Sequence, residues 1–238
     1  MSVMSSSVVV EKKSADLSRL SLGCSGLDEV LGGGLESGII TKIYGEAGSG
    51  KTNVCLQAAR EASCLGLGVV YVDSEGVSGE RLEQICSGCS MGLESVLDRI
   101  RFFEVKSLEQ QEEVIRSLGD LEDVGLVVID TLNMLYRMKT DEENREESFR
   151  SLARQVSDLQ MLARTKKVFV LVAEQVYRDH RSGEVRPFTI TNAEHMMKTI
   201  LRLDRGEELG CRQVTVIRHR SVAEGKSSVF CIDECGLL

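Results

Sequence analysis

The segment 45–52, with the sequence Gly-Glu-Ala-Gly-Ser-Gly-Lys-Thr, constrains the fold of this chain more than any other feature. It matches the pattern G-x-x-x-x-G-K-[S/T] at every fixed position, and it lies between an expected strand, 39–44, and an expected helix, 51–65. In this context the glycines let backbone N–H groups converge on phosphate oxygens at a helix start, where the helix dipole favours an anion. The segment therefore predicts a nucleoside triphosphate site, and the alternative is a Gly-rich turn that carries a lysine by chance.

The same segment supplies most of the ligands that a bound nucleotide needs. Lys51 offers a mobile ammonium group to the β- and γ-phosphates, and Thr52 offers a hydroxyl group to Mg²⁺. ATP with Mg²⁺ is therefore the expected cofactor. The residues expected to surround the phosphates are Gly45, Glu46, Ala47, Gly48, Ser49, Gly50, Lys51, Thr52 and Asn53.

Apolar segments rich in β-branched residues alternate with expected helices along most of the chain. After the P-loop helix, strands are expected at 68–73, 101–105, 125–130 and 167–173, and helices at 79–86, 108–118 and 141–164. A polar loop then leads to three strands whose short connections suggest antiparallel pairing, at 199–204, 212–218 and 227–232. This order predicts an α/β fold, with a mostly parallel twisted sheet flanked by helices and a C-terminal antiparallel extension.

Length and composition fit one globular domain. The 238 residues are 42% apolar, and no apolar run approaches the roughly 18 residues of a membrane span. The N-terminus lacks the charged and apolar regions of a signal peptide, which predicts a cytoplasmic protein. Residues 1–20 are polar and Ser-rich, and we expect a flexible tail or an edge strand through 8–10, ahead of one core domain at 21–238.

Eight cysteines are spread through the chain, and reduced thiols are expected for an intracellular protein. The alternative is a four-sulfur zinc site. Cys86 and Cys89 form one pair with metal-like spacing, and Cys231 and Cys235 form another, so the two pairs would have to meet in space.

Three polar side chains at the ends of expected strands distinguish an ATPase from other P-loop proteins. Asp130 ends the apolar strand 126–130 and is expected to reach the Mg²⁺ shell from a strand beside the P-loop strand, unless it caps the next helix or turn. Glu75 follows the strand 68–73 and can orient the attacking water as a base, unless it is an exposed loop acid. Gln175 can sense the γ-phosphate and pass its state to the following loop.

The order and spacing of several motifs resemble the core of the RecA/RadA recombinases. The likeness covers the chain from about residue 20, and its motifs are the P-loop, Leu22-Gly-Cys-Ser-Gly-Leu-Asp-Glu-Val-Leu-Gly-Gly-Gly-Leu-Glu36, Tyr71-Val-Asp-Ser-Glu-Gly76 and Glu80-Arg81-Leu82. The resemblance implies a RecA-like ATPase core. It also implies that Glu75 is the catalytic glutamate, Asp130 the Walker-B aspartate and Gln175 the switch glutamine. Arg81 falls where the family places an arginine against the adenine face, and the alternative is an ordinary surface arginine.

The resemblance further implies two loops that bind single-stranded DNA, at 136–144 and 177–191. The first stretch runs from Arg137 and Lys139 directly into acidic residues. The second is more basic, so phosphate contacts are expected from Arg178, Arg181 and Arg186. The net charge of −8 argues against a protein that coats DNA through bulk electrostatics, so any DNA contact should be local.

Arg218 and Arg220 lie at the end of an expected strand. Related KaiC-like ATPases use a basic pair at this place to reach the nucleotide of the next protomer. This resemblance implies a homo-oligomer with an arginine finger supplied in trans, and a plain basic strand end is the alternative.

The residues before the core contain no aromatic-x-x-Ala hook of the kind that RadA-type filaments use, and no small DNA-binding domain precedes the core. With the acidic composition, this favours an accessory protein in homologous recombination and DNA repair that has modest ATPase activity. Its expected partners are single-stranded or branched DNA and the main, RadA-like recombinase, and its expected place is the nucleoid.

Three other functions are consistent with the sequence. A KaiC-like signalling ATPase would act through protein partners without DNA. A P-loop kinase would phosphorylate a small substrate, although Glu75 disfavours it. A structural protein would hold ATP without turnover.

Overall fold

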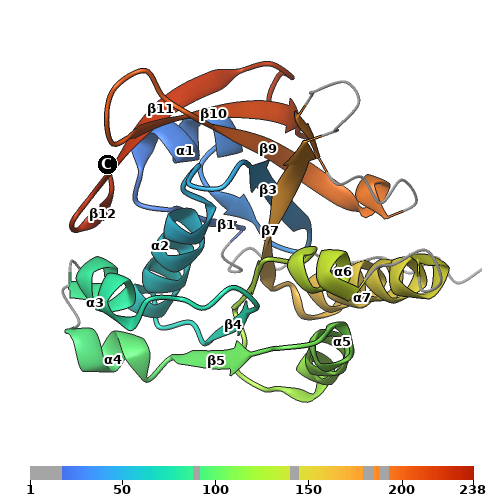
Figure 1. The fold of residues 1–238 in the computed structure, drawn as a ribbon. Helices are drawn as coiled ribbons and strands as arrows, with labels where there is room; N and C mark the ends of the chain where they lie inside the picture. The colour runs from blue at the N-terminus through green and yellow to red at the C-terminus, as the bar shows by residue number, and fades with distance from the viewer. Residues whose placement is uncertain (1–17, 88–91, 140–144, 179–184, 188–192) are drawn as a thin grey trace, which may run out of the picture.

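A computed structural model describes residues 18–87, 92–139, 145–178, 185–187 and 193–238. Within them the main sheet has the strand order β12-β11-β10-β9-β3-β7-β6-β4-β5, and β8 pairs with β7 (Figure 1). The strands are β1 Arg19–Leu20, β2 Leu35–Glu36, β3 Ile40–Gly45, β4 Val69–Asp73, β5 Ile100–Glu104, β6 Leu126–Asp130, β7 Phe169–Arg178, β8 Val185–Pro187, β9 Met197–Arg205, β10 Cys211–Arg218, β11 Ser227–Asp233 and β12 Gly236–Leu237.

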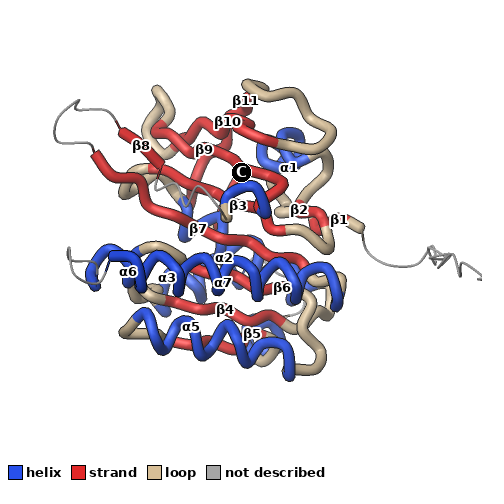
Figure 2. Tube along the Cα trace, turned by 90° about the vertical axis from the view of Figure 1, so that its right-hand side faces the viewer, coloured by secondary structure: helices blue, strands red, loops and turns tan. Residues whose placement is uncertain are grey.

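Helices cover both faces of the parallel part of this sheet. Figures 1 and 2 show α2, α3 and α4 on one side and α5, α6 and α7 on the other. The helices are α1 Ser25–Leu31, α2 Lys51–Cys64, α3 Gly79–Ser87, α4 Leu93–Leu97, α5 Leu108–Ser117, α6 Met134–Lys139 and α7 Arg145–Lys166, with short 3-10 turns η1 Leu118–Asp120 and η2 Glu194–Met196.

The apolar pattern of the central strands follows from this double cover. Every residue of β4 and β6 is buried, because parallel strands between two helix layers have no solvent face. One core lies between the sheet and α1 and α2, and a second lies between the sheet and α5 and α7. The expected α/β fold with a mostly parallel sheet is confirmed.

Helix α7 shows how spacing in the sequence becomes packing. Leu152, Val156 and Leu159 recur every three or four residues, and all three are fully buried on the sheet. Phe149 is half-buried against the same core. The helix begins at Arg145, and the expected first turn at 141–144 lies outside the described residues.

The strand order corrects one expectation about the site. Strand β7 lies between β3 and β6, so Asp130 does not come from a strand beside the P-loop strand, and Glu75 follows β4, which lies farther away still. The chain builds β4, β5 and β6 on one side of β3 and then returns to insert β7. Hydrophobic patterns do not reveal such a crossover, because each parallel strand is equally apolar.

The C-terminal extension is antiparallel only beyond its first strand. Strand β9 pairs in parallel with β3, whereas β10, β11 and β12 follow one another as antiparallel neighbours. The small β1–β2 sheet, the hairpin strand β8 and the short helices α4 and α6 were not expected from the sequence. Elements of two to six residues have too few positions to show a periodic pattern.

Helix α1 ends at a glycine and begins without a side-chain cap. Gly32 terminates it in the left-handed conformation, with φ of 67°, which glycine adopts without steric cost. Its N-terminal residue Cys24 makes no side-chain cap, and Asp28 instead accepts hydrogen bonds from Ser21 and from the Leu22 N–H.

The possible edge strand at 8–10 lies outside the described residues. Among the residues that the structure does describe, no helix has the length and apolar character needed to cross a membrane.

Candidate nucleotide site

The P-loop forms a tight turn between β3 and α2. Gly48 and Gly50 have φ of 77° and 94°, the left-handed region that side chains with a Cβ rarely adopt. Inside the turn, the Ser49 N–H donates to the Glu46 carbonyl at 3.1 Å. Residues 46–48 are exposed, while Ser49 and Gly50 are buried at the start of the helix. The loop thus presents backbone N–H groups beside a helix N-terminus, as phosphate binding requires.

Lys51 is held within this loop. Its ammonium group donates to the carbonyls of Gly45 and Glu46 at 3.0 and 2.9 Å, and the residue is buried. Burial lowers the pKa of Lys51, while the carboxylates of Glu75 and Asp130 oppose this change. A phosphate would provide a stronger partner for the same ammonium group than the two carbonyls do.

Asp130 reaches the P-loop region from the end of β6. Its Oδ2 accepts a hydrogen bond of 2.8 Å from the Tyr71 hydroxyl, and the residue is 1% exposed. Burial raises the pKa of Asp130 to about 6, although the hydroxyl groups of Tyr71 and Thr52 lower it. Its other oxygen, Oδ1, has no hydrogen-bond partner among the described residues.

This pair of oxygen donors fits Mg²⁺. The free Oδ1 of Asp130 and the hydroxyl of Thr52 are hard oxygen ligands, which Mg²⁺ prefers. Within the described residues no group of three or more His, Cys, Asp or Glu side chains is arranged to hold a metal ion by itself. Phosphate oxygens and water would therefore complete the coordination of an ion held here.

Glu75 and Gln175 meet at the carboxyl edge of the sheet. The Glu75 Oε1 accepts hydrogen bonds from the Gln175 side-chain amide at 2.7 Å and from the Thr131 hydroxyl at 2.8 Å. Asn133 holds Gln175 by two bonds to its backbone, of 2.8 and 3.0 Å. Arg137 donates to the Gln175 side-chain oxygen at 3.3 Å. A chain of contacts therefore links the carboxylate to helix α6.

The backbone around Glu75 is shaped by a residue that sequence reasoning missed. Asp73 ends β4, and its carboxylate accepts from the N–H groups of Glu75, Gly76 and Val77 at 3.0, 2.9 and 2.6 Å. These bonds hold the loop in a turn that exposes the Glu75 side chain. An aspartate that is followed by Ser-Glu-Gly at a strand end was the available signal, because Asp commonly bonds the backbone two residues ahead.

Arg81 bridges three elements beside the P-loop helix. Its guanidinium group donates to Asn53 at 2.7 Å, to Gln84 at 3.1 Å and to the Glu234 carbonyl at 3.1 Å. Arg81 is thus a half-buried residue in contact with α2, rather than an ordinary surface arginine.

Comparison with known proteins agrees with this geometry. The Rad51 family model matches residues 13–237. This chain belongs to the Rad51 family. A DNA repair and recombination protein RadB from Thermoplasma acidophilum is 38% identical over 92% of this chain and 93% of its own length, and one from Methanococcoides burtonii is 37% identical over 90% and 95%. A crystal structure of the RadB recombinase superposes with a TM-score of 0.79, at 33% identity, over 92% of this chain and 98% of that one.

The family match confirms the resemblance to the recombinase core, and the relatives named RadB are similar to this chain over nearly its whole length. Rad51-family proteins are ATPases and bind nucleotide with Mg²⁺.

The two stretches expected to bind DNA are more regular than expected. Helix α6, which begins at Met134, covers 136–139 of the first stretch, and 140–144 lies outside the described residues. Arg137 contacts Gln175, and Lys139 pairs with Glu109. In the second stretch β7 extends to Arg178 and pairs with β8. A hairpin therefore replaces part of the expected loop.

The basic residues of that second stretch fall partly within the hairpin. Arg178 pairs in register with Val185, and Arg186 pairs with Tyr177. Arg181 lies outside the described residues. The two described arginines therefore lie on paired strands that leave the sheet at its carboxyl edge.

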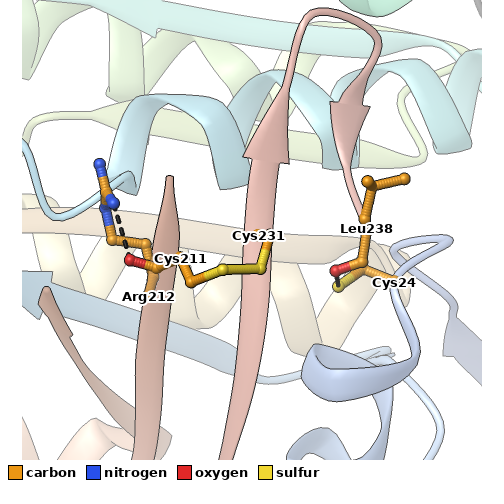
Figure 3. The surroundings of a disulfide bond; sticks show 5 residues. All are labelled: Cys24, Cys211, Arg212, Cys231 and Leu238. Atoms are coloured by element: carbon orange, nitrogen blue, oxygen red, sulfur yellow. Dashed lines mark hydrogen bonds between the residues drawn. A yellow bond between two sulfur atoms is a disulfide. The ribbon is translucent and has the colours of Figure 1, made fainter. Parts of the chain in front are cut away.

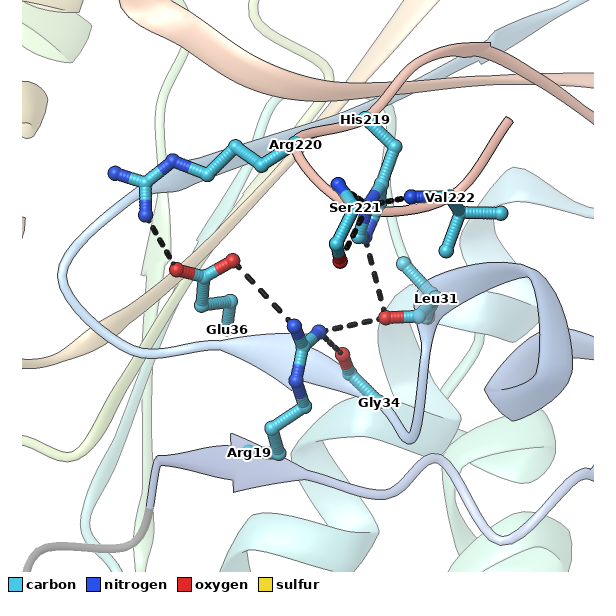
Figure 4. A network of polar contacts seen from close by, with 8 residues as sticks. All are labelled: Arg19, Leu31, Gly34, Glu36, His219, Arg220, Ser221 and Val222. Atoms are coloured by element: carbon cyan, nitrogen blue, oxygen red, sulfur yellow. Dashed lines mark hydrogen bonds and ion pairs between the residues drawn. The ribbon is translucent and has the colours of Figure 1, made fainter. Parts of the chain in front are cut away.

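Arg218 and Arg220 lie at the opposite end of β10 from the P-loop. Arg218 donates to the Glu194 carbonyl at 3.0 Å. Arg220 forms an ion pair with Glu36 at 2.6 Å, and Arg19 contacts the same carboxylate. Figure 4 shows this network. Neither arginine contacts the P-loop of its own chain in the described structure.

The structure removes one cysteine, Cys231, from the hypothetical zinc site. Cys231 forms a disulfide bond with Cys211 across β10 and β11 (Figure 3), and Cys64 is also disulfide-bonded. The expectation of reduced thiols is therefore wrong for these residues. Cys86 is a buried free thiol, and its partner in the zinc hypothesis, Cys89, lies outside the described residues. Because Cys231 is oxidised, a four-sulfur site cannot form in this structure.

Proposed function

We propose that the chain is an ATP-binding, slowly hydrolysing accessory protein of homologous recombination and DNA repair. The observation that carries this proposal is the meeting of Lys51, Asp130 and Glu75 at one edge of the sheet, in a chain of the Rad51 family. Relatives bearing the words DNA repair and recombination in their names support the same process. They favour it over KaiC-like signalling.

The proposed division of labour follows the contacts. Residues 45–53 bind the phosphates, Thr52 and Asp130 hold Mg²⁺, and Arg81 stacks on the adenine. Bound Mg²⁺ neutralises charge on the phosphate oxygens. Glu75 orients and deprotonates the attacking water. Because Gln175 donates to Glu75 and accepts from Arg137, loss of the γ-phosphate would change contacts that reach α6.

Partners and assembly belong to the same proposal. Arg178, Arg181 and Arg186 contact the phosphates of single-stranded or branched DNA, and the protein assists a RadA-like main recombinase at the nucleoid. In a homo-oligomer, Arg218 and Arg220 act on the nucleotide of the next protomer. Arg220 would have to exchange Glu36 for that phosphate.

The test is ATP hydrolysis with and without single-stranded DNA at low salt, beside a Lys51→Ala control. The expected result is a Lys51-dependent rate that DNA changes. A rate that DNA leaves unchanged would favour action through protein partners, and a rate that survives Lys51→Ala would come from a contaminant.

A further inference from the structure

Two arginines outside the nucleotide motif donate hydrogen bonds to backbone carbonyls of the P-loop. Arg205 ends β9 and Arg212 is the second residue of β10, and the two are direct partners in the antiparallel register. Arg212 Nε donates to the Gly48 carbonyl at 3.1 Å, and Arg205 Nη2 donates to the Ala47 carbonyl at 3.4 Å. The partners in both contacts are more than 150 residues apart in the sequence, so no local sequence pattern predicts them.

These contacts complete a series along the loop. Lys51 donates to the carbonyls of Gly45 and Glu46, so cationic side chains hold four consecutive carbonyls, those of residues 45–48. A bound phosphate would draw the ammonium group of Lys51 away from the carbonyls of Gly45 and Glu46. The hydrogen bonds from Arg205 and Arg212 would remain.

The direction of these hydrogen bonds matters for phosphate binding. In a planar trans peptide the C=O and the following N–H point in opposite directions. A guanidinium group that binds the Ala47 carbonyl therefore fixes the Gly48 N–H on the opposite side of the peptide, away from Arg205. Gly48 and Gly50 have left-handed φ values, a backbone conformation that needs such support because glycine is otherwise free to leave it.

The strands that carry the arginines pack closely against the P-loop. A Cβ placed on Gly50 would lie 2.9 Å from the Ile232 side chain and 3.6 Å from Cγ of Arg212, so β10 and β11 pack directly against the loop. Arg212 donates a second bond, of 2.8 Å, to the Cys211 carbonyl, next to the disulfide that joins the two strands (Figure 3). The C-terminal extension therefore presents Arg212 in a defined position.

We propose that Arg205 and Arg212 are positioning residues of the phosphate site, which hold the carbonyls of Ala47 and Gly48 outward so that the loop keeps its phosphate-binding shape. The C-terminal extension thereby takes part in nucleotide binding. Guanidinium groups stay charged at all working pH values and add positive potential beside the phosphates. This inference rests on the proposed ATP binding.

The test compares the Kd of MgATP and of inorganic tripolyphosphate for R205Q, R212Q and the double variant by titration calorimetry. Each lost hydrogen bond to a charged group should weaken both ligands by roughly three- to tenfold, and the double variant by roughly ten- to a hundredfold. Arg202→Gln is the matched control, because Arg202 lies on the same strand but pairs with Asp204, and its Kd should equal that of the parent. Unchanged melting temperatures would show that the variants fold.

R212K separates positioning from charge. Lysine keeps the positive charge but cannot bond the Gly48 and Cys211 carbonyls together in the planar geometry of arginine. The proposal expects R212K to bind nearly as weakly as R212Q, and a parent-like Kd for R212K would overturn the positioning role.

A Lys51→Ala variant distinguishes failure of this inference from failure of the proposed function. If the parent binds MgATP, Lys51→Ala does not, and the double arginine variant matches the parent, the positioning role alone is overturned. If the parent itself does not bind MgATP, the proposed function fails and this inference fails with it.

Discussion

Asp130 shows how one buried carboxylate can serve a ligand at a cost to the free protein. It lies at the end of a fully buried strand, where the Tyr71 hydroxyl satisfies only one of its oxygens. Burial raises its pKa from an ordinary value of 3.8 to about 6, so the charged form is poorly solvated until a cation arrives. Asp130 therefore lowers the stability of the free protein, and its unpaired Oδ1 is available to a cation such as the proposed Mg²⁺.

The first prediction concerns Asp130→Asn and pH. The pKa of Asp130 is higher in the folded protein than in the unfolded chain, so protonation of Asp130 favours the folded state. This contribution to the free energy of unfolding is complete below about pH 4 and is lost as the pH rises to about 6. Above pH 6 the ionised carboxylate lowers the free energy of unfolding by up to about 3 kcal/mol. The uncharged amide of the asparagine variant avoids this loss. Urea unfolding without Mg²⁺ should show Asp130→Asn to be more stable than the parent at pH 8 and close to it at pH 4. An equal effect at both pH values would contradict this reasoning.

The second prediction concerns Glu75→Gln. The glutamine oxygen can still accept from Thr131 and Gln175, but an amide cannot take a proton from water. We expect the ATP hydrolysis rate to fall about 100-fold or more, with the Kd for MgATP nearly unchanged. Steady-state hydrolysis and nucleotide titration check this. A parent-like rate would mean that the protein holds ATP without using Glu75 for turnover.

At the scale of elements, a buried ionic cluster joins β3, the strand before the P-loop, to β7, the strand that carries Gln175. Lys42 of β3 lies 3.1 Å from Glu174 of β7 and 2.7 Å from Glu194 of η2. The side chains of Lys42 and Glu174 are each only 1% exposed. Burial lowers the pKa of Lys42, but the two carboxylates outweigh burial and raise it overall. The ammonium group of Lys42 thus links β3, β7 and η2.

The third prediction concerns this cluster. Lys42→Met should destabilise the fold by about 3–5 kcal/mol, because it leaves the Glu174 carboxylate buried without its cation. The double variant Lys42→Met, Glu174→Met should recover most of that loss, since no buried charge remains in the pair. Guanidinium unfolding of both variants measures the difference. A double variant no better than the single one would show that the cost comes from packing instead.

At the scale of the whole molecule, one sheet brings distant segments to a single edge. The P-loop follows β3, Glu75 follows β4, Asp130 ends β6, and Gln175 lies in β7 in register with Gly45. These strands are parallel, so the four features lie at the same edge of the sheet. The start of β10 joins them there through Arg212. Against a net charge of −8, any DNA surface must be a local concentration of arginines.

The fourth prediction concerns that DNA surface. Replacing Arg178, Arg181 and Arg186 by Gln should abolish weak single-stranded DNA binding at moderate salt. At low salt the triple variant should show a slope of log binding constant against log salt concentration that is smaller by about 2. The reason is that each of the three lost phosphate contacts would have released about 0.7 counterions from single-stranded DNA. Fluorescence anisotropy over a salt series measures both.

A charge-matched control keeps this test specific. Gln at Arg101, Arg116 and Arg150, which are exposed and lie elsewhere on the molecule, removes the same charge from the chain. Binding by this control should stay close to that of the parent. Equal losses in the two triple variants would mean that overall charge, and not the hairpin, governs DNA binding.

The sequence alone determined what depends on local order. The P-loop pattern, the apolar strands and the stripe of α7 each need only neighbouring residues, because backbone geometry converts their spacing directly into a turn, a strand or a helix face. The type of each long element and the general fold class were therefore predictable. So were Lys51, Asp130 and Glu75, which stand at the ends of readable elements.

Tertiary structure decided the relations between distant segments. The insertion of β7 between β3 and β6, the Cys211–Cys231 bond and the contacts of Arg205 and Arg212 with the P-loop depend on strand order and register. Parallel strands that are buried on both faces look alike in sequence, so their order is set only when their helices and crossovers pack together. The same packing brings two arginines at strand ends into contact with the P-loop, more than 150 residues away in the sequence.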